Sequence, residues 1–546
     1  MPDPLGDLTK LLARVPLEAQ ALVTVTRAGL LGPEPPRRLL QLFQALDRYG
    51  AMGAAVIVAA LRHGDRPGVA DELGTLTFDE LDARSNALAN AFRARGIGSD
   101  VGVGILCRNH RGMLDATFGA LKAGARALYL NTDFAAPQAK EVSAREGVEV
   151  IVYDQEFTDV VSGVDAPQGR FLAWTDEASD VPTLESLIAA GNRAAPPPPE
   201  SPGKVVILTS GTTGTPKGAN RAQPRGLVAP AALLSRVPFR AREATYVAPP
   251  LYHALGLGMM LVAVGLGSTV VMRRRATPEQ ILIGVAEHRC SSLIVVPVLL
   301  NRLLLVGEDR IKELDVSALR IIFSSGAQLE GALALRAMEV FGDVVYNLYG
   351  STEVAYATIA TPEDLRVAPG CAGKPPLGTS VRLYDEKGGQ VPTGVTGRIF
   401  VNSGQEFSGY TGGGGKEVID NHMSTGDVGH FDDGGRLFVD GRDDEMIVSG
   451  GENVFPREVE ELLAGHDAVH EAAAIGVPDD DFGQRLRAFV VVEPGASIDA
   501  DGVKAFVKAN LARYKVPREV VFLDQLPRNP SGKVLKRELA ELDVEA

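Results

Sequence analysis

The chain has 546 residues, of which 45% are apolar and 23% are charged, and its formal net charge at pH 7 is -14. That length exceeds what one hydrophobic core supports, so we expect at least two soluble globular domains. The acidic balance excludes a general nucleic-acid-binding protein, because phosphate backbones are held by clustered Lys and Arg side chains.

Residues 1–60 are expected to form a helical extension, since apolar residues recur at spacings of three and four in LTKLLARV and PRRLLQLFQALDRYG. A collar packed on the main body is one interpretation, and peripheral contact with a membrane is the alternative. We see no export signal at the amino terminus. The apolar run AMGAAVIVAAL is much shorter than the roughly twenty residues of a bilayer span.

The three cysteines also indicate the compartment. Cys107, Cys290 and Cys371 are far apart, odd in number and without metal-ligand spacing. This pattern is typical of free, buried thiols in a reducing compartment. We therefore expect a cytoplasmic protein, and leave peripheral membrane association open.

From about Gly68, short β-branched runs alternate with helical segments, as in VGVGILC, DATFGALKAG and ARALYL. Such alternation predicts parallel-rich sheets with helices on both faces. After about residue 370 the sequence pattern is typical of β-hairpins. After about residue 443 it is typical of a compact α+β module. The basic triplet Arg273, Arg274 and Arg275 is interpreted as a solvated strand end. We expect an α/β protein with a helical extension (1–60), a large domain (61–442) and a small mobile domain (443–546).

A glycine-rich segment, LTSGTTGTPKG at 208–218, follows the apolar run KVVI. Glycines let the main chain approach phosphate closely, and N–H and hydroxyl groups can bind it. A nucleotide-hydrolysing P-loop is excluded because Gly218 follows Lys217 where Ser or Thr is required, and no G-x-G-x-x-G opens a helix after the first strand. The expected phosphate-binding residues are Thr209, Ser210, Gly211, Thr212, Thr213, Gly214 and Lys217.

Four more segments follow in a recognisable order: NLYGSTE at 347–353, STGD at 424–427, GRDDEMIVSGGENVFPREVE at 441–460 and PRNPSGKVLKREL at 527–539. Together with the glycine-rich loop they resemble the motifs of the adenylate-forming superfamily, which comprises acyl-CoA synthetases, adenylation domains and luciferases. The similarity is greatest to bacterial fatty-acyl-CoA synthetases. It implies ATP, Mg²⁺ and coenzyme A as cofactors.

The resemblance also assigns roles around the nucleotide. Tyr349 is expected to stack on adenine, Thr352 to donate to the α-phosphate, and Glu353 to hold magnesium, which prefers carboxylate oxygen. Asp427 is expected to accept from the ribose hydroxyls, with Arg442 as an added donor. The segment SSGAQ supplies Gly326 and Ala327 beside adenine.

Lys533 is the expected catalytic residue of acid activation, since an ammonium at the α-phosphate stabilises the charge that develops there. The resemblance places a hinge at Asp444, about which the small domain rotates. Gly450 and Gly451 would then let the pantetheine arm of CoA pass between the domains.

The segment APPLYHALGLG, 248–258, offers no carboxylate to pair with an amino group, so an amino-acid substrate is disfavoured. By resemblance His253 lies at the mouth of the acyl site. We expect a fatty acid–CoA ligase for medium- or long-chain acids. Delivery to a carrier protein, an aryl-acid substrate, a luciferase-like oxygenation, a nonenzymatic sensor and a homodimer remain alternatives.

Overall fold

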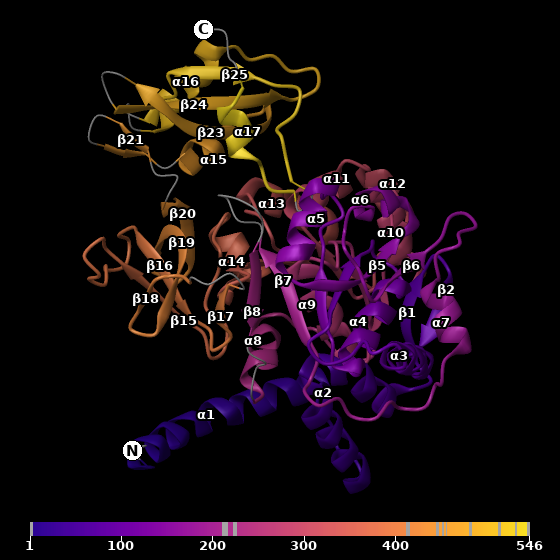
Figure 1. Ribbon diagram of the computed structural model, residues 1–546. Coiled ribbons are helices and arrows are strands. Elements are labelled where there is room, and N and C mark those ends of the chain that lie inside the picture. The colour runs from indigo at the N-terminus through magenta and orange to yellow at the C-terminus, as the bar shows by residue number, and fades with distance from the viewer. Residues whose placement is uncertain are drawn as a thin grey trace.

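The computed structural model describes residues 4–209, 217–221, 226–410, 415–443, 447–449, 452–454, 456–479, 483–511, 515–529 and 532–542. A large lobe holds three sheets and a small lobe holds the fourth, with the small lobe at one end and the N-terminal helices at the other (Figure 1). The predicted α/β class is confirmed. All three cysteines are free and buried, as expected.

The N-terminal extension consists of α1 (Pro4–Ala28) and α2 (Pro36–His63), which ends three residues beyond the expected boundary at 60. Helix α1 packs on the large lobe through Ala21 and Val25. Helix α2 is kinked at Gly50, whose φ of 68° lies in the left-handed region that glycine tolerates. Within the described ranges no helix combines the length and hydropathy that a bilayer crossing requires.

A seven-stranded sheet, with strand order β17-β8-β7-β4-β3-β5-β6, forms one half of the large lobe. Its central strands are parallel and buried on both faces: Val150 and Val152 point into one core, and Ile151 and Tyr153 into another. A capping box between Thr77 and Glu80 starts the first covering helix. The strands are β3 (Gly102–Leu106), β4 (Arg126–Tyr129), β5 (Val148–Asp154), β6 (Gly169–Trp174), β7 (Lys204–Thr209), β8 (Lys217–Arg221) and β17 (Phe407–Tyr410). The helices are α3 (Phe78–Arg93), α4 (Arg111–Ala123), α5 (Ala136–Arg145), the 3-10 helix η1 (Gln155–Phe157), α6 (Thr158–Val161) and α7 (Leu184–Ala190).

An eight-stranded sheet, ordered β14-β13-β12-β11-β9-β10-β1-β2, forms the other half and is parallel except at its two ends. Ile294 and Phe323 from this sheet enter the same core as Val150 and Val152. The two halves therefore share one core. The strands are β1 (Pro67–Asp71), β2 (Gly74–Thr77), β9 (Ala244–Val247), β10 (Thr269–Val271), β11 (Ser292–Val295), β12 (Ile321–Ser324), β13 (Val345–Ser351) and β14 (Ala355–Ala360). The helices are α8 (Val228–Arg236), α9 (Ala254–Gly265), α10 (Pro278–Glu287), α11 (Pro297–Leu304), α12 (Glu308–Glu313), α13 (Gly331–Phe341) and α14 (Pro362–Val367).

Arginines also join the two halves, and for Arg274 this corrects the interpretation of the 273–275 triplet as a solvated strand end, whereas the Arg275 side chain is 71% exposed. The Arg274 guanidinium lies 4.3 Å above the Trp174 ring and 2.9 Å from Glu156, and its side chain is only 14% exposed. Arg108 reaches the same carboxylate at 2.8 Å and Arg275 at 2.6 Å. Although burial opposes it, hydrogen bonds from Arg108 and Arg275 lower the pKa of Glu156 to about 2.

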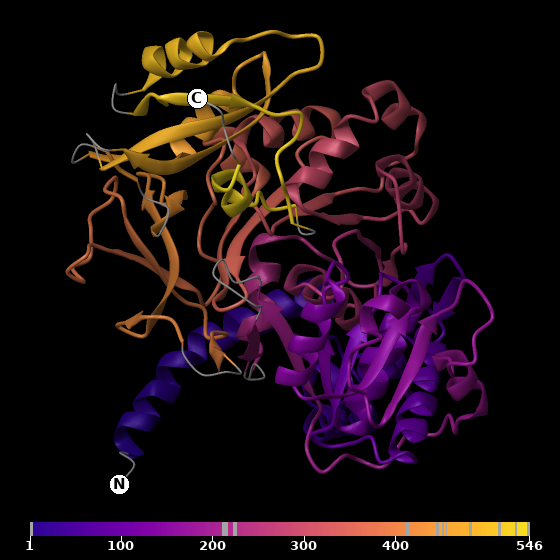
Figure 2. The same cartoon turned by 45° about the horizontal axis from the view of Figure 1, so that its top comes forward.

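The remaining sheets are mostly antiparallel. One comprises β15 (Ser380–Tyr384), β16 (Gly397–Asn402), β18 (Val418–Ile419), β19 (His422–Phe431) and β20 (Leu437–Arg442). The small lobe, gold to yellow in Figure 2, begins after it. The chain changes sheet between β20 and β21, where the predicted division at 442/443 lies; the division itself remains a prediction. The small lobe contains β21 (Ile447–Ser449), β22 (Glu452–Val454), α15 (Pro456–Ala464), β23 (Val469–Asp479), β24 (Gly483–Val492), α16 (Ala500–Asn510), β25 (Glu519–Phe522) and α17 (Lys536–Ala540).

Candidate active site

The glycine-rich loop connects two antiparallel neighbours, β7 and β8. The backbones of Thr209 and Lys217 are paired across these strands, so the two ends of the loop meet at the carboxyl end of β7. Carboxyl ends of strands in open α/β sheets are the usual place for ligands. The predicted residues Ser210, Gly211, Thr212, Thr213 and Gly214 lie outside the described part of the chain.

Glu353 lies in the turn between β13 and β14, next to the base of this loop. Its Oε1 accepts a hydrogen bond of 2.8 Å from the hydroxyl of Tyr410. Tyr410 in turn is paired with Ala219 of β8, so the strand that leaves the loop also places the partner of Glu353. Thr352 precedes Glu353 in the same turn, and Gly350 packs so tightly on the Ala355 carbonyl that a Cβ there would lie 1.9 Å from its oxygen.

Asp427, Arg442 and Tyr349 form one polar cluster. Asp427 and Arg442 face each other across β19 and β20, and Asp427 Oδ1 lies 3.1 Å from Arg442 Nη1. Tyr349 donates its hydroxyl proton to Asp427 Oδ2 at 2.5 Å. Burial first, and the charge of Asp427 second, raise the pKa of Tyr349 far above its ordinary value. Three residues predicted from three separate motifs thus come together.

Two further polar groups, which the sequence did not single out, lie on the adjacent strands β12 and β13. Ser324 and Asn347 are paired in register, and both are buried. Neither Ser324 Oγ nor Asn347 Oδ1 has a hydrogen-bond partner among the described residues. Buried polar atoms without partners are rare and indicate a place that a ligand completes. Gly326 and Ala327 follow directly after β12, with Gly326 exposed and Ala327 half-buried.

His253 precedes α9 and leaves its own helix end uncapped. Its Nε2 is buried without a partner among the described residues, and its ring lies 4.5 Å from that of Tyr252. Burial lowers the pKa of His253 to about 4, so the imidazole is neutral at physiological pH. One turn along α9, a Cβ added to Gly258 would meet nothing within 4 Å. A neutral hydrogen-bonding group thus lies at the start of a helix that has open space one turn further along.

The loop that carries Lys533 reaches from the small lobe to the large one, as the yellow segment near α11 and α13 shows (Figure 1). Gly532 lies against Val298, where an added Cβ would come within 2.4 Å of Cγ1. Val296 lies next to both Gly532 and Gly326. The loop is held by a hydrogen bond of 2.8 Å from the Lys533 backbone N–H to Asn529 Oδ1, and Lys533 itself is exposed.

Where the lobes meet there is a cavity of about 310 Å³. The large lobe lines it with Ala327 and Glu330, and the small lobe with Arg528 and Gly532. The predicted hinge residue Asp444 and the glycines Gly450 and Gly451 lie outside the described residues. Just before them, Asp443 forms a 3.1 Å ion pair with Arg398 of β16.

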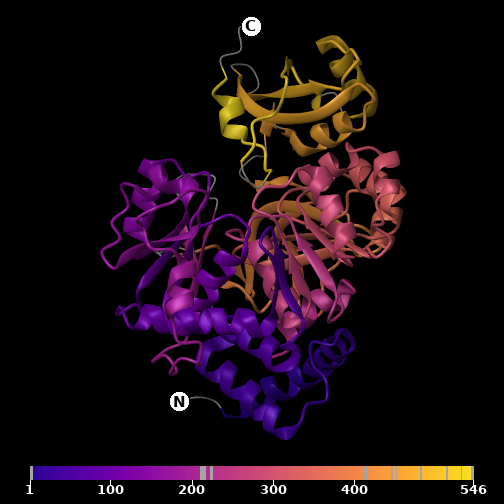
Figure 3. The ribbon, with the colours of Figure 1, turned by 90° about the vertical axis from the view of Figure 1, so that its right-hand side faces the viewer.

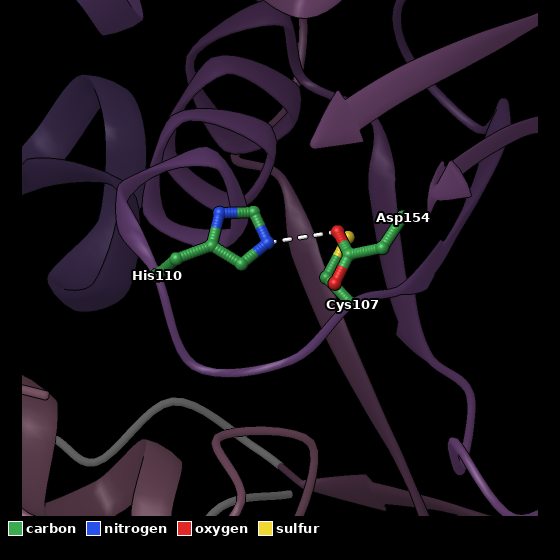
Figure 4. Close-up of side chains that lie close together, drawn as sticks. All are labelled: Cys107, His110 and Asp154. Atoms are coloured by element: carbon green, nitrogen blue, oxygen red, sulfur yellow. Dashed lines mark hydrogen bonds and ion pairs between the residues drawn. The ribbon is translucent and has the colours of Figure 1, made fainter. Parts of the chain in front are cut away.

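One buried cluster elsewhere has the composition of a metal site. Cys107, His110 and Asp154 lie together at the carboxyl ends of β3 and β5 (Figure 4). His110 Nδ1 accepts from the Gly112 N–H at 3.1 Å, so its proton is on Nε2, which donates to Asp154 Oδ1 at 2.8 Å. Burial raises the pKa of the Cys107 thiol far above its ordinary value, which disfavours the thiolate that metals bind. The cluster is a satisfied hydrogen-bond network rather than a metal centre.

Comparison with known proteins covers most of the chain. The AMP-binding enzyme family matches residues 57–411, and the AMP-binding enzyme C-terminal domain matches residues 458–533. A feruloyl-CoA synthase from Amycolatopsis sp is 34% identical over 88% of this chain and 95% of its own length. The long-chain-fatty-acid–CoA ligase FadD13 of Mycobacterium tuberculosis is 29% identical over 85% and 93%. The crystal structure of ATP-bound MatB from Rhodopseudomonas palustris superposes with a TM-score of 0.77 at 28% identity, covering 87% of this chain and 96% of that one.

Proposed function

Since the chain belongs to the AMP-binding enzyme family, we propose that it is an acid–CoA ligase that makes acyl-AMP from a carboxylic acid and ATP and then an acyl-CoA thioester. Membership confirms the resemblance to adenylate-forming enzymes. The observation that carries the mechanism is the position of the Lys533 loop, which packs on Val296 and Val298 beside Gly326. This brings an ammonium-bearing loop of one lobe to the side of the other on which we propose that ATP binds.

In the first half-reaction a carboxylate oxygen of the acid attacks the α-phosphorus of ATP, and the bond to pyrophosphate breaks. Negative charge grows on the phosphoryl oxygens and on the leaving pyrophosphate. The Lys533 ammonium and the N–H groups of the 210–214 loop would stabilise this charge, and preorganised donors of this kind supply much of the rate enhancement of enzymes. Asp427 and Arg442 would fix the ribose.

Glu353 fits a magnesium site. Its carboxylate is a hard oxygen ligand, and the Tyr410 hydroxyl orients it through Oε1 while Oε2 remains for another contact. When bound, magnesium would neutralise part of the phosphate charge. The residues of this chain would bind and orient the nucleotide around it.

In the second half-reaction the sulfur of CoA attacks the acyl carbon, the bond to AMP breaks, and the thiol proton is released to AMP or water. The Lys533 loop occupies the boundary between the lobes, so the thiol needs it withdrawn. Rotation at Asp444 would satisfy this need, and Gly450 and Gly451 would then leave room for the pantetheine arm. We place the reaction in the cytoplasm, where the three buried thiols remain reduced.

We propose medium- and long-chain fatty acids as substrates. The neutral His253, whose Nε2 has no partner among the residues that the structure describes, would contact the acid near its carboxyl group. The open space at Gly258 would take the first part of an apolar chain. A second candidate is an aryl acid, which the similarity to a feruloyl-CoA synthase favours. An aromatic ring occupies the same kind of apolar space, so the chemistry of the carboxyl end is common to both.

One experiment tests the proposal and separates its alternatives. The purified chain is incubated with ATP, Mg²⁺ and a panel of fatty and aryl acids, with and without CoA, and pyrophosphate, acyl-AMP and acyl-CoA are measured separately. We expect acyl-CoA from fatty acids. Acyl-AMP that accumulates despite CoA would indicate a carrier-protein acceptor. Product from aryl acids alone would show that the substrates are aryl acids. No product from any acid would refute the proposal that the protein is a ligase.

A further inference from the structure

The first half of α2 exposes an apolar face that no other described element covers. Leu39 is 40% exposed, Leu40 58%, Phe43 68% and Leu46 43%. With 3.6 residues per turn these four side chains occupy roughly 120° of the helix circumference. We call them the outer face of α2. A contiguous exposed apolar patch on a helix indicates a binding surface, because single surface leucines are ordinary but clusters are not.

This half-helix is fixed to the body from its other side. Ala45 and Tyr49 are buried, and the Tyr49 hydroxyl donates to the Pro196 carbonyl at 2.9 Å. The kink at Gly50 then turns the second half of α2 into the large lobe. Figures 1 and 3 both place the helices at the end of the molecule opposite the small lobe. The outer face is therefore held outward, where a large flat partner can reach it without touching the active site.

Charge identifies the kind of partner. Residues 1–63 carry a net charge of +2, whereas the rest of the chain carries -16. Arg37 lies about one turn before Leu40 and Arg48 about two turns after it, and both are exposed. Asp47 is the one acidic residue between 36 and 49. A basic amphipathic helix is typical of binding to anionic lipid surfaces. Two copies that met through this face would bring the arginines of one toward the arginines of the other, which disfavours a homodimer through this face.

We propose that the outer face of α2 docks the protein on an anionic lipid bilayer. Leu40 and Phe43 enter the boundary between headgroups and acyl chains, and Arg37 and Arg48 contact lipid phosphates. The contact is peripheral and does not depend on catalysis. It would bring the ligase to a surface in which apolar acids dissolve.

Vesicle sedimentation of the full chain tests the docking without any activity measurement. We expect binding to phosphatidylcholine vesicles that contain phosphatidylglycerol to be roughly tenfold or more stronger than to pure phosphatidylcholine, and to weaken with salt. Phe43→Glu and Leu40→Glu should each lower binding about tenfold. The matched control is Leu305→Glu, at a leucine 66% exposed on the body, which should bind like the parent. Arg37→Glu should remove most of the preference for the anionic lipid.

A second measurement reports insertion directly. In Phe43→Cys an environment-sensitive dye would label position 43 selectively, because the three native cysteines are buried. Its emission should shift to shorter wavelength on anionic vesicles. Unchanged emission, or sedimentation that Phe43→Glu leaves unaltered, would overturn the proposal. So would a dimer that Phe43→Glu converts to a monomer without any vesicle binding, since the face would then be a contact between copies.

Discussion

The Tyr410 hydroxyl donates to Glu353 Oε1 across 2.8 Å, although the two residues are 57 positions apart. Burial and the neighbouring Glu353 carboxylate raise the pKa of Tyr410, so this hydroxyl stays protonated and remains a donor. The contact joins the proposed magnesium ligand to the strand beside the phosphate loop.

Tyr410→Phe should therefore weaken the response to magnesium while leaving the fold intact. Loss of an orienting partner of a metal ligand commonly costs ten- to a hundredfold in metal affinity or activity. We expect the Mg²⁺ concentration for half-maximal pyrophosphate release to rise about tenfold. The control is Tyr384→Phe, which removes a hydroxyl 3.2 Å from the Asp420 carboxylate on a different hairpin. If the Tyr410→Phe enzyme has the same magnesium dependence as the parent, the proposal that Tyr410 orients Glu353 as a magnesium ligand is wrong.

Lys533→Ala should abolish acid activation and spare the transfer of a supplied acyl group. Removing one donor to a transition-state charge typically costs about 10²–10³ in rate. Pyrophosphate release should fall by that factor, while conversion of added acyl-AMP to acyl-CoA stays near the parent rate. Lys508→Ala, at an exposed lysine on α16, serves as the control. Equal loss of rate in both half-reactions would contradict the proposal that Lys533 acts in acid activation only.

Asp444→Pro should give the opposite result, because proline fixes φ and restricts rotation at the predicted hinge. We expect acyl-AMP to form at the parent rate and to accumulate when CoA is present. Asp444→Ala, which removes the side chain but keeps the backbone free, should transfer normally. If the proline variant makes acyl-CoA as fast as the parent, the pivot lies elsewhere.

His253→Gln should affect the acid and not the pH profile. Because burial lowers the pKa of His253 to about 4, its imidazole does not titrate between pH 5.5 and 8. The glutamine amide preserves a neutral hydrogen-bonding group, so kcat should change little, whereas His253→Ala should raise the KM for the acid about tenfold. A rate profile whose pKa near 6.5 disappears in either variant would show that the histidine titrates after all.

His63 should make the protein less stable in acid. Burial first, and then Arg62, lower the pKa of His63 to about 4, below its value of 6.5 in an unfolded chain. Between these values the unfolded chain binds the proton and the folded protein does not, so stability falls as pH drops from 6.5 toward 4. His63→Leu should flatten this slope in urea unfolding between pH 5 and 7, whereas His288→Gln, at an exposed site, should not. An unchanged slope in His63→Leu would place the acid sensitivity on other groups.

The sequence was informative where the residues of the predicted site lie in short contiguous motifs. The motifs at 347–353, 424–427 and 441–460 predicted a shared nucleotide site, and the structure brings Tyr349, Asp427 and Arg442 into hydrogen-bond contact. Their roles toward ATP remain predictions. The alternation of strands and helices predicted the α/β fold because each period is local to its own segment.

Relationships across long sequence separations could not be predicted. The pairing of Tyr410 with Ala219 joins segments nearly two hundred residues apart, and periodicity contains no information about such partners. Arg274 looked solvated because its neighbours in sequence are arginines, whereas its structural neighbours are Trp174 and Glu156. The outer face of α2 was ambiguous for the same reason, since a helical pattern does not say which side the body covers.

The ion pairs of Glu156 bear on how such ligases can be recombined. Arginines from both sheets converge on this carboxylate, and the sheets also share one core, so the two halves of the large lobe behave as a single rigid frame. The frame contains His253 and Gly258, and the small lobe contributes neither. In chimeras, the preference for an acid should consequently be that of the protein that supplies the large lobe. A small lobe grafted from a relative should alter turnover without altering which acids are accepted.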